Sequence, residues 1–210
     1  MNSKQYLLFV IIYAFFCYLM LGISFQYIPL DSDVAFLRIK QDEYAIFYYP
    51  FAFFIHVFAS LFVLPVGFTQ FSNYIQKRHT VWHRNIGKLY IFTILFFAAP
   101  SGFILGIHAN GSWSSQLAFC LLALGWFYFT WMALVKIKAK DWQAHRDFMY
   151  RSFALTLSAI TLRAWKYIIV ALFHPRPMDT YRIVAWLGWV LNLIIAEIII
   201  YRLHRRRIEG

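Results

Sequence analysis

The chain has 210 residues, of which 61% are hydrophobic, 21% aromatic and only 14% charged. Soluble domains carry about 25% charged residues, so this composition excludes an ordinary soluble globular protein. The formal net charge of +11 suggests nucleic-acid binding at first sight, but that interpretation depends on where the charges lie along the chain.

Six apolar runs cover most of the chain, at residues 6–28, 46–69, 86–106, 117–135, 148–172 and 181–201. A helix needs roughly 20 residues to cross about 30 Å of hydrocarbon, and each run is close to this length. The first run is longer than the apolar core of a secretory signal, and no Ala-x-Ala site follows it, so we expect it to be retained. The sequence therefore predicts an all-α protein, a single integral membrane domain over residues 1–210 with six transmembrane helices.

Lys and Arg concentrate in alternate connections between these runs. The 29–45 connection holds four of the nine acids, whereas the 70–88 connection holds none. The basic positions on one side are Lys4, Lys77, Arg78, Arg84, Lys88, Lys136, Lys138, Lys140, Arg146, Arg151, Arg202, Arg205, Arg206 and Arg207. Because Lys and Arg prefer the cytoplasmic side, both termini are predicted to be cytoplasmic. Topology thus explains the basicity without a nucleic-acid partner, and we expect the tail to contact anionic lipid headgroups.

No motif of a soluble enzyme occurs in the sequence. The cysteines, Cys17 and Cys120, both fall inside apolar runs and have no metal-ligand spacing. There is no glycine-rich phosphate loop, no G-x-S-x-G and no HExxH. The sequence therefore leaves open whether the protein is an enzyme.

Polar residues inside the apolar runs form helical stripes. Because steps of three, four and seven residues stay on one helix face, the fifth run aligns His145, Met149, Ser152, Thr156, Ala159 and Arg163. The third run likewise aligns His83, Gly87, Tyr90, Ser101 and His108, and the second run aligns Tyr49, His56, Ser60, Gly67 and Gln70. Ionisable groups in a bilayer usually face the bundle interior. We therefore expect an internal polar pocket between the second, third and fifth spans.

The remaining spans are expected to support this pocket. The fourth run is mostly aromatic, and the sixth carries Asn192 and Glu197, so we assign packing roles to both. Glu197 lies near the inner end of its run, where a basic group is the expected partner. By counting residues, His56 and Arg163 fall near the middle of the membrane, whereas His83 and His145 fall at its cytoplasmic surface.

Several of these residues resemble a known family. The motif His-Arg-x-x-Gly-Lys-x-Tyr at 83–90, the motif His-Arg-x-Phe-Met-x-Arg-Ser at 145–152, the Leu-Arg pair at 162–163 and His56 resemble a bacterial family of multi-pass membrane proteins, domain of unknown function 2306 (DUF2306). The resemblance covers about 46–172; Lys88 and Phe148 stand where that family is expected to have Arg and Trp. It implies a multi-pass protein of the bacterial inner membrane and leaves the activity open.

The first interpretation of the histidines is a haem site. Paired imidazoles from two helices ligate haem iron in membrane cytochromes, and His83 and His145 match in depth on alternate spans. Arg84 and Arg146 would then pair with the haem propionates, and Gly87 would open the slot. Since His56 has no histidine partner at its depth, we expect at most one haem b, acting in membrane electron transfer.

Two other interpretations stay open. In the second, His56 and Arg163, with Tyr49, Ser60, Tyr90 and Thr156, bind an anionic or quinone-like small molecule or relay protons without a cofactor. No inverted repeat and no broken helix pair is expected, so no transporter signature supports this. In the third, the juxtamembrane His, Arg and Trp residues are interface anchors of a structural or accessory membrane subunit.

Overall fold

The computed structural model describes residues 3–209, except for the side chains at positions 3, 4, 6, 9, 73, 207 and 208, and within this range it contains helices and no strand. The helices are α1 (Ser3–Phe25), η1 (Ala35–Ile39), α2 (Gln41–Tyr44), α3 (Tyr49–Thr69), α4 (Asn73–Arg78), α5 (Thr80–Thr93), η2 (Ile94–Ala98), α6 (Ala99–Ile107), α7 (Trp113–Lys138), α8 (Trp142–Thr156), α9 (Ser158–Phe173) and α10 (Pro177–Ile208). The predicted all-α class is confirmed.

Four helical stretches are long and apolar enough to cross a membrane: Tyr49–Thr69, Thr80–Ile107, Trp113–Lys138 and Pro177–Arg206. The pair α8 and α9 makes a fifth if it counts as one span, while Val10–Phe25 in α1 is apolar but shorter. A helix therefore occupies every predicted apolar run, and the number of six spans stays a prediction.

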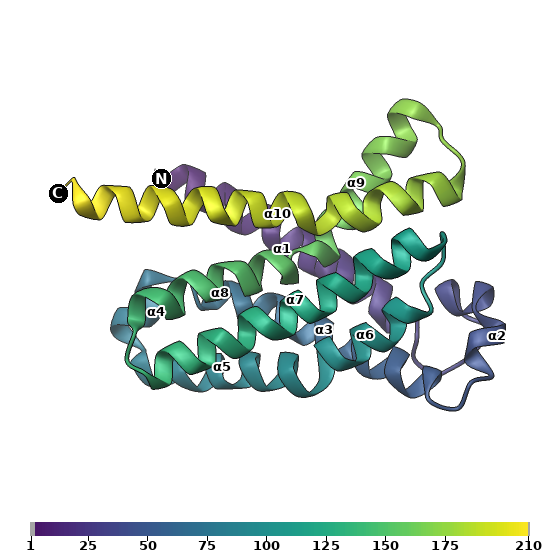
Figure 1. The fold of residues 1–210 in the computed structure, drawn as a ribbon, viewed down its shortest axis with the longest axis horizontal. Helices are drawn as coiled ribbons and strands as arrows, with labels where there is room; N and C mark the ends of the chain where they lie inside the picture. Colours follow the sequence, from purple (N-terminus) through teal and green to yellow (C-terminus); the bar gives the residue numbers. More distant parts are fainter. Residues whose placement is uncertain (1–2, 210) are drawn as a thin grey trace.

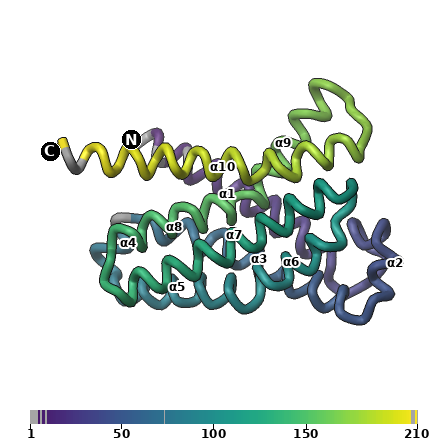
Figure 2. The backbone as a smooth tube through the Cα atoms, viewed as in Figure 1, coloured from purple at the N-terminus to yellow at the C-terminus, as the bar shows by residue number. Residues whose placement is uncertain are grey.

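The long helices lie side by side along one axis (Figures 1 and 2). Both termini, α4 and the turn between α7 and α8 lie at one end of the molecule, and η1 and α2 lie at the other (Figure 1). We call the first the basic end, because it carries the basic connections and the basic tail. This arrangement matches the predicted alternation of the connections; that the basic end faces the cytoplasm stays a prediction.

The third predicted span starts earlier than expected, at Thr80, and changes its winding midway. At Ile94–Ala98 the helix widens to a π-turn before continuing as α6. Pro100 follows directly, and a proline inside a helix removes one backbone donor and crowds the carbonyl four residues before it. The wider turn accommodates this loss. Residues on either side of η2 therefore do not keep the single-face alignment that a uniform helix predicts.

The fifth predicted span is two helices that meet at Leu157 with a bend of 42°. The expectation that no span is broken was therefore wrong. Thr156 bonds the carbonyl of Ser152, and Thr161 bonds that of Leu157, which is the hydroxyl back-bonding that bends helices. Thr161 also donates to the Gly188 carbonyl of α10 at 2.5 Å, so α9 bends away from α8 while it stays packed on α10 (Figure 1).

The 29–45 connection forms a folded cap that contains η1 and α2. Leu37 is fully buried in it and packs in a cluster with Tyr27, Tyr49 and Phe53. Lys40 is 1% exposed, and its ammonium donates to the Glu43 carboxylate and to the His108 carbonyl, both at 2.5 Å. Burial alone would raise the pKa of the Glu43 carboxyl. The hydrogen bonds from Lys40 and from the Glu43 backbone N–H lower this pKa by more than burial raises it, so the net shift is downward. The pair fastens the cap to the end of α6.

Candidate functional site

A chain of hydroxyl groups joins α5, α7 and α8 in the centre of the bundle. The Tyr90 hydroxyl lies 3.1 Å from Ser152 Oγ and 2.9 Å from Thr156 Oγ1. Trp126 donates its indole N–H to Thr156 at 3.1 Å, and Thr130 lies 2.7 Å from Ser152. All five side chains are buried. Tyr90 and Thr156, which were expected to line a pocket, therefore bond to protein groups. Fully paired networks of this kind rigidify a core.

Trp126 and Thr130 were missed by the sequence analysis, which gave the fourth span a packing role only. Their spacing of four residues places both on one face of α7. Asn192 of α10 was missed in the same way, since its amide donates to the carbonyls of Ala154 and Gly188 and to the Thr161 hydroxyl. The available signal was an isolated polar residue inside an apolar run, Thr130 in the fourth run and Asn192 in the sixth.

His56 is held by the π-turn of the third span. Its Nδ1 lies 2.9 Å from the Ala98 carbonyl and 3.4 Å from Ser101 Oγ, and its Nε2 lies 3.4 Å from Ser60 Oγ. A carbonyl only accepts, so Nδ1 carries the proton. Gly102 allows this approach, since a Cβ there would lie 2.9 Å from the ring. Both ring nitrogens of His56 therefore have protein partners.

Neither of the other two predicted ligand residues is hydrogen-bonded to this histidine in the described structure. Tyr49 is buried in the cap cluster, with the ring of His108 edge-on at 5.5 Å. Arg163 donates to the Ala159 carbonyl of its own helix at 2.6 Å and lies within electrostatic range of His56, Tyr27 and Tyr167. In the described part of the chain it makes no ion pair. The structure thus bonds His56 to Ser60 and Tyr90 to Thr156, places Tyr49 in the cap cluster, and leaves Arg163 within electrostatic range of His56.

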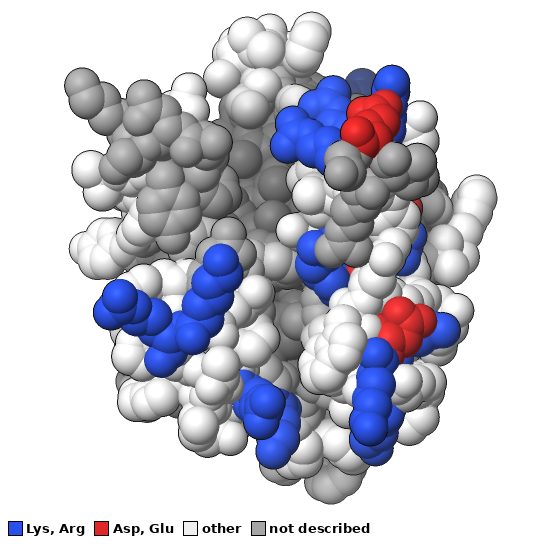
Figure 3. Space-filling model, turned by 90° about the vertical axis from the view of Figure 1, so that its left-hand side faces the viewer, with Lys and Arg blue, Asp and Glu red and all other residues white. Residues whose placement is uncertain are grey.

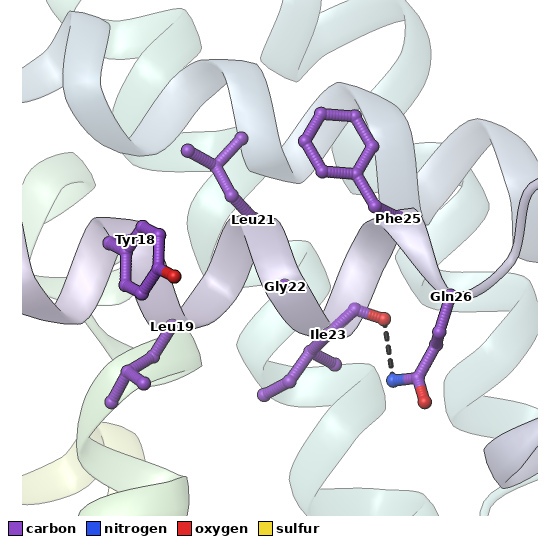
Figure 4. Close-up of a pocket in the computed structure, with 7 residues that line it drawn as sticks. All are labelled: Tyr18, Leu19, Leu21, Gly22, Ile23, Phe25 and Gln26. Atoms are coloured by element: carbon purple, nitrogen blue, oxygen red, sulfur yellow. Dashed lines mark hydrogen bonds between the residues drawn. The ribbon is translucent and has the colours of Figure 1, made fainter.

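The most pronounced hollows bounded by described residues are both surface grooves. One, of about 600 Å³, follows α1 from Tyr18 to Gln26, where the Gln26 amide donates to the Ile23 carbonyl (Figure 4). The other, of about 540 Å³, follows α10 from Arg182 to Leu191. Neither is lined by a histidine or by any residue predicted to bind a ligand.

The two His-Arg motifs meet at the basic end. His145 Nδ1 lies 2.8 Å from the Ala133 carbonyl. The proton must therefore sit on Nδ1, and Nε2 has no partner among the described residues. His83 lies within electrostatic range of His145, and its buried Nδ1 has no hydrogen-bond partner in the described structure. Arg146 has two further buried nitrogens, Nε and Nη2, without described partners. We call His83, His145 and Arg146 the inner mouth.

The side chains around the inner mouth differ from the arrangement expected for haem. Arg84 is exposed, although it remains within electrostatic range of His83. The space over Gly87 holds the Gln70 amide, because a Cβ at Gly87 would lie 2.8 Å from Gln70 Oε1. Met149, one turn from His145, is buried in the main core cluster. Gly87 therefore admits a protein side chain where the sequence suggested a slot.

A second polar group at the basic end joins α8 to α10. Asp147 is buried, and its Oδ2 lies 2.8 Å from His204 Nε2, while Oδ1 has no described partner. Farther along the two helices Arg151 forms a bidentate pair with Glu197, at 2.5 and 2.8 Å. The expected pairing of Glu197 with a basic group is confirmed. His204 was missed, because nothing in the sequence relates the tail to Asp147.

Lys and Arg side chains gather over the face seen at the basic end (Figure 3). This face is formed by α4, the α7–α8 turn and the end of α10, with exposed Lys77, Arg78, Lys138, Lys140, Arg202, Arg205 and Arg206. Acidic side chains also lie on this face (Figure 3), with Asp141 beside Lys136 and Glu209 beside Arg205, but basic ones outnumber them. A surface with excess positive charge attracts anions and raises their local concentration. The inner mouth thus lies at the end where anions concentrate.

The fold and these apolar helices define a multi-pass α-helical membrane protein. A family model, described as a predicted membrane protein (DUF2306), matches residues 53–200. The chain belongs to this family, which confirms the resemblance seen in its motifs. No curated protein and no solved structure matches the chain.

Proposed function

We propose that this membrane protein binds a small anionic ligand at the inner mouth, between His83, His145 and Arg146. We place the protein in a bacterial inner membrane with its basic end facing the cytoplasm, and the ligand enters from that end. Arg146 donates hydrogen bonds to the anion, and the two imidazoles orient it. The protein acts as a binding or transport component, and the other predicted ligand residues hold the bundle together.

One observation carries this proposal: three buried nitrogens of the His-Arg motifs lack hydrogen-bond partners in the described structure. Buried polar atoms are nearly always paired with protein, water or ligand, and each one left unpaired costs roughly 1–3 kcal/mol. The hydroxyl network and His56, in contrast, have protein partners. The unpaired nitrogens support a ligand at the inner mouth, and no such atom supports one at the hydroxyl network or at His56.

The charges at the site select an anion. Arg146 is always protonated and only donates hydrogen bonds, while the one carboxylate next to it in sequence, Asp147, is bonded to His204. A guanidinium binds two oxygens of a carboxylate or phosphate at once, which makes this chemistry specific.

Binding of inorganic phosphate and of acetate to the detergent-purified protein tests the proposal, by calorimetry at low ionic strength. Wild-type protein should bind at least one of them, and Arg146→Gln should weaken that binding by tenfold or more, on the order of 1.4 kcal/mol. Arg78→Gln removes an exposed arginine from the same end and is the matched control. Equal loss in both variants would show nonspecific attraction to the basic end and would refute a site at Arg146.

Haem b is the second candidate, and the proton on His145 Nδ1 favours it. An imidazole that donates from Nδ1 to a backbone carbonyl presents Nε2 as a ligand, the usual arrangement at metals. His83 would be the second residue to hold the haem iron, with Gln70 displaced from Gly87. The absorption spectrum of the purified protein, oxidised by air and then reduced by dithionite, tests this. A Soret band lost in both His83→Ala and His145→Ala supports haem, and a protein without that band excludes it.

A further inference from the structure

The last helix carries an unpartnered face along most of its length. α10 runs along the outside of the bundle (Figure 1), and Ile183, Ile194, Glu197 and Tyr201 are exposed on it. Leu187 and Val190, which are half-buried, lie between them. In chain order the six positions are 183, 187, 190, 194, 197 and 201, at steps of four, three, four, three and four. That spacing keeps them on one side of a helix and is the pattern by which two helices pack in a left-handed coiled coil.

The first half of this face is open and shallow. The groove of about 540 Å³ is lined by Ile183, Leu187 and Val190 of the pattern, together with Arg182, Trp186 and Leu191. A second helix that packs there inserts its side chains between those of α10. Shape and spacing therefore both fit another helix of the same repeat.

Glu197 interrupts the apolar pattern at one position. Its side chain is 52% exposed and pairs with Arg151, which is 21% exposed. Glu197 lies five residues before Arg202, the first basic residue of the tail, or about 7 Å along the axis. Side chains lean toward the N-terminus of their helix, so Glu197 leans away from the basic end. A carboxylate held in this position is costly to expose to lipid.

The pair has bonding capacity left over. A guanidinium carries more N–H groups than the two that reach Glu197, and each carboxylate oxygen accepts more than one hydrogen bond. Two copies of a membrane protein share one insertion direction, so a twofold axis between them runs along the membrane normal. Residues of equal depth then meet across it, and in such an interface each patch contacts itself. Glu197 of each copy then faces Glu197 of the other, and the Arg151 guanidinium bonded to each carboxylate has N–H groups left with which to bridge the two.

We infer that the protein forms a parallel homodimer through this face of α10, with the Arg151–Glu197 pairs of the two copies joined at its inner half. A polar group at one position of an apolar seam fixes register and orientation. The charged pair fixes the register of the two α10 helices along the membrane normal, and the apolar positions supply the contact area. This inference is independent of the anion site.

Cysteine cross-linking in lipid nanodiscs or native membranes tests the dimer. In a background of Cys17→Ala and Cys120→Ala, Ile194→Cys places a thiol on the seam. Ile195→Cys is the matched control, because Ile194 and Ile195 are similarly exposed, at 49% and 55%, and differ by about 100° around the helix. We expect disulfide-linked dimers to form several-fold faster with Ile194→Cys.

The charged pair is tested in the same background. Arg151→Gln with Glu197→Gln removes both charges and should reduce the Ile194→Cys cross-link several-fold, while far-ultraviolet circular dichroism reports whether the helices remain folded. Equal cross-linking at positions 194 and 195, or none at either, overturns the dimer. Cross-linking of Ile194→Cys only to a different protein in native membranes also overturns it, and assigns the face to that partner. A seam cross-link that the double variant leaves unchanged overturns the role of the pair.

Discussion

The hydroxyl of Tyr90 bonds to Ser152 and Thr156 of α8 and has no access to solvent. We expect Tyr90→Phe to destabilise the protein by about 0.5–1.5 kcal/mol, the net value of a typical hydrogen bond. The loss stays moderate because Trp126 and Thr130 still bond to the two α8 hydroxyls. The midpoint of thermal unfolding in detergent measures it. Tyr18→Phe, at an exposed tyrosine on α1, should leave that midpoint unchanged, and equal shifts in both variants would contradict the prediction.

Arg163 differs from an ordinary buried cation in that its described partner is a backbone carbonyl. Removing one member of a buried ion pair costs roughly 3–5 kcal/mol because the other charge is left unpaired. No carboxylate is left behind here, so we expect Arg163→Leu to fold and to keep its unfolding midpoint within a few degrees. Thermal unfolding and expression level check this. A large loss of both would show that Arg163 has a charged partner outside the described structure.

At the scale of elements, α9 and α10 touch through a glycine. A Cβ at Gly188 would lie 2.9 Å from Leu162 Cβ and 3.1 Å from its Cα. We therefore expect Gly188→Ala to destabilise the protein by roughly 1–3 kcal/mol, as overpacking does. Gly22→Ala is the control, because nothing lies within 4 Å of its new methyl group. If the two alanine variants unfold at the same temperature, the close approach of α9 and α10 is not as described.

The cap at the other end depends on a carboxylate. The pKa of Glu43 is lowered in the folded protein, so its contribution to stability is present above the ordinary carboxyl pKa, about 4.3, and is lost as pH falls through the folded value. We expect amide exchange at 35–45, corrected for intrinsic rates, to accelerate as pH drops below 4. In Glu43→Gln this pH dependence should vanish, and a cap equally protected at pH 3 and pH 7 would contradict the role of the pair.

The sequence patterns predicted where the helices lie, but they did not predict where a helix bends or widens. Apolar runs predict helices because any helix in lipid must be apolar. The bend at Leu157 instead comes from hydroxyls that bond to backbone carbonyls and to Gly188 of another helix. The sequence does not show which partner Thr161 selects. The same holds for Gln70, since a glycine at 87 indicates a close approach without saying what approaches.

At the scale of the whole molecule, both termini and the basic connections share one end (Figure 1). We predict that this end is cytoplasmic, because Lys and Arg are retained on that side. Reporter fusions after residues 77 and 210 should be active only as cytoplasmic reporters, and fusions near 35 and 111 only as periplasmic ones. Periplasmic activity at 77 would reverse the orientation and place the inner mouth outside the cell.

The candidate site was predictable only in part at this scale. The motifs at 83–90 and 145–152 pointed to His83, His145 and Arg146, because a His-Arg pair recurs at the start of two apolar runs. The expected common pocket with His56 and Arg163 assumed straight helices. The π-turn at Ile94–Ala98 and the bend at Leu157 change those alignments. What sequence periodicity misses is the point at which a helix stops being regular.

The enclosure of Lys40 has a chemical consequence. An amine must be deprotonated and accessible to be acylated, whereas this ammonium is 1% exposed and bonded to Glu43 and His108. A membrane-impermeant acylating reagent reaches it only in molecules whose cap has opened. The rate at which this lysine is modified in intact cells would then measure how often the cap opens, without purification of the protein.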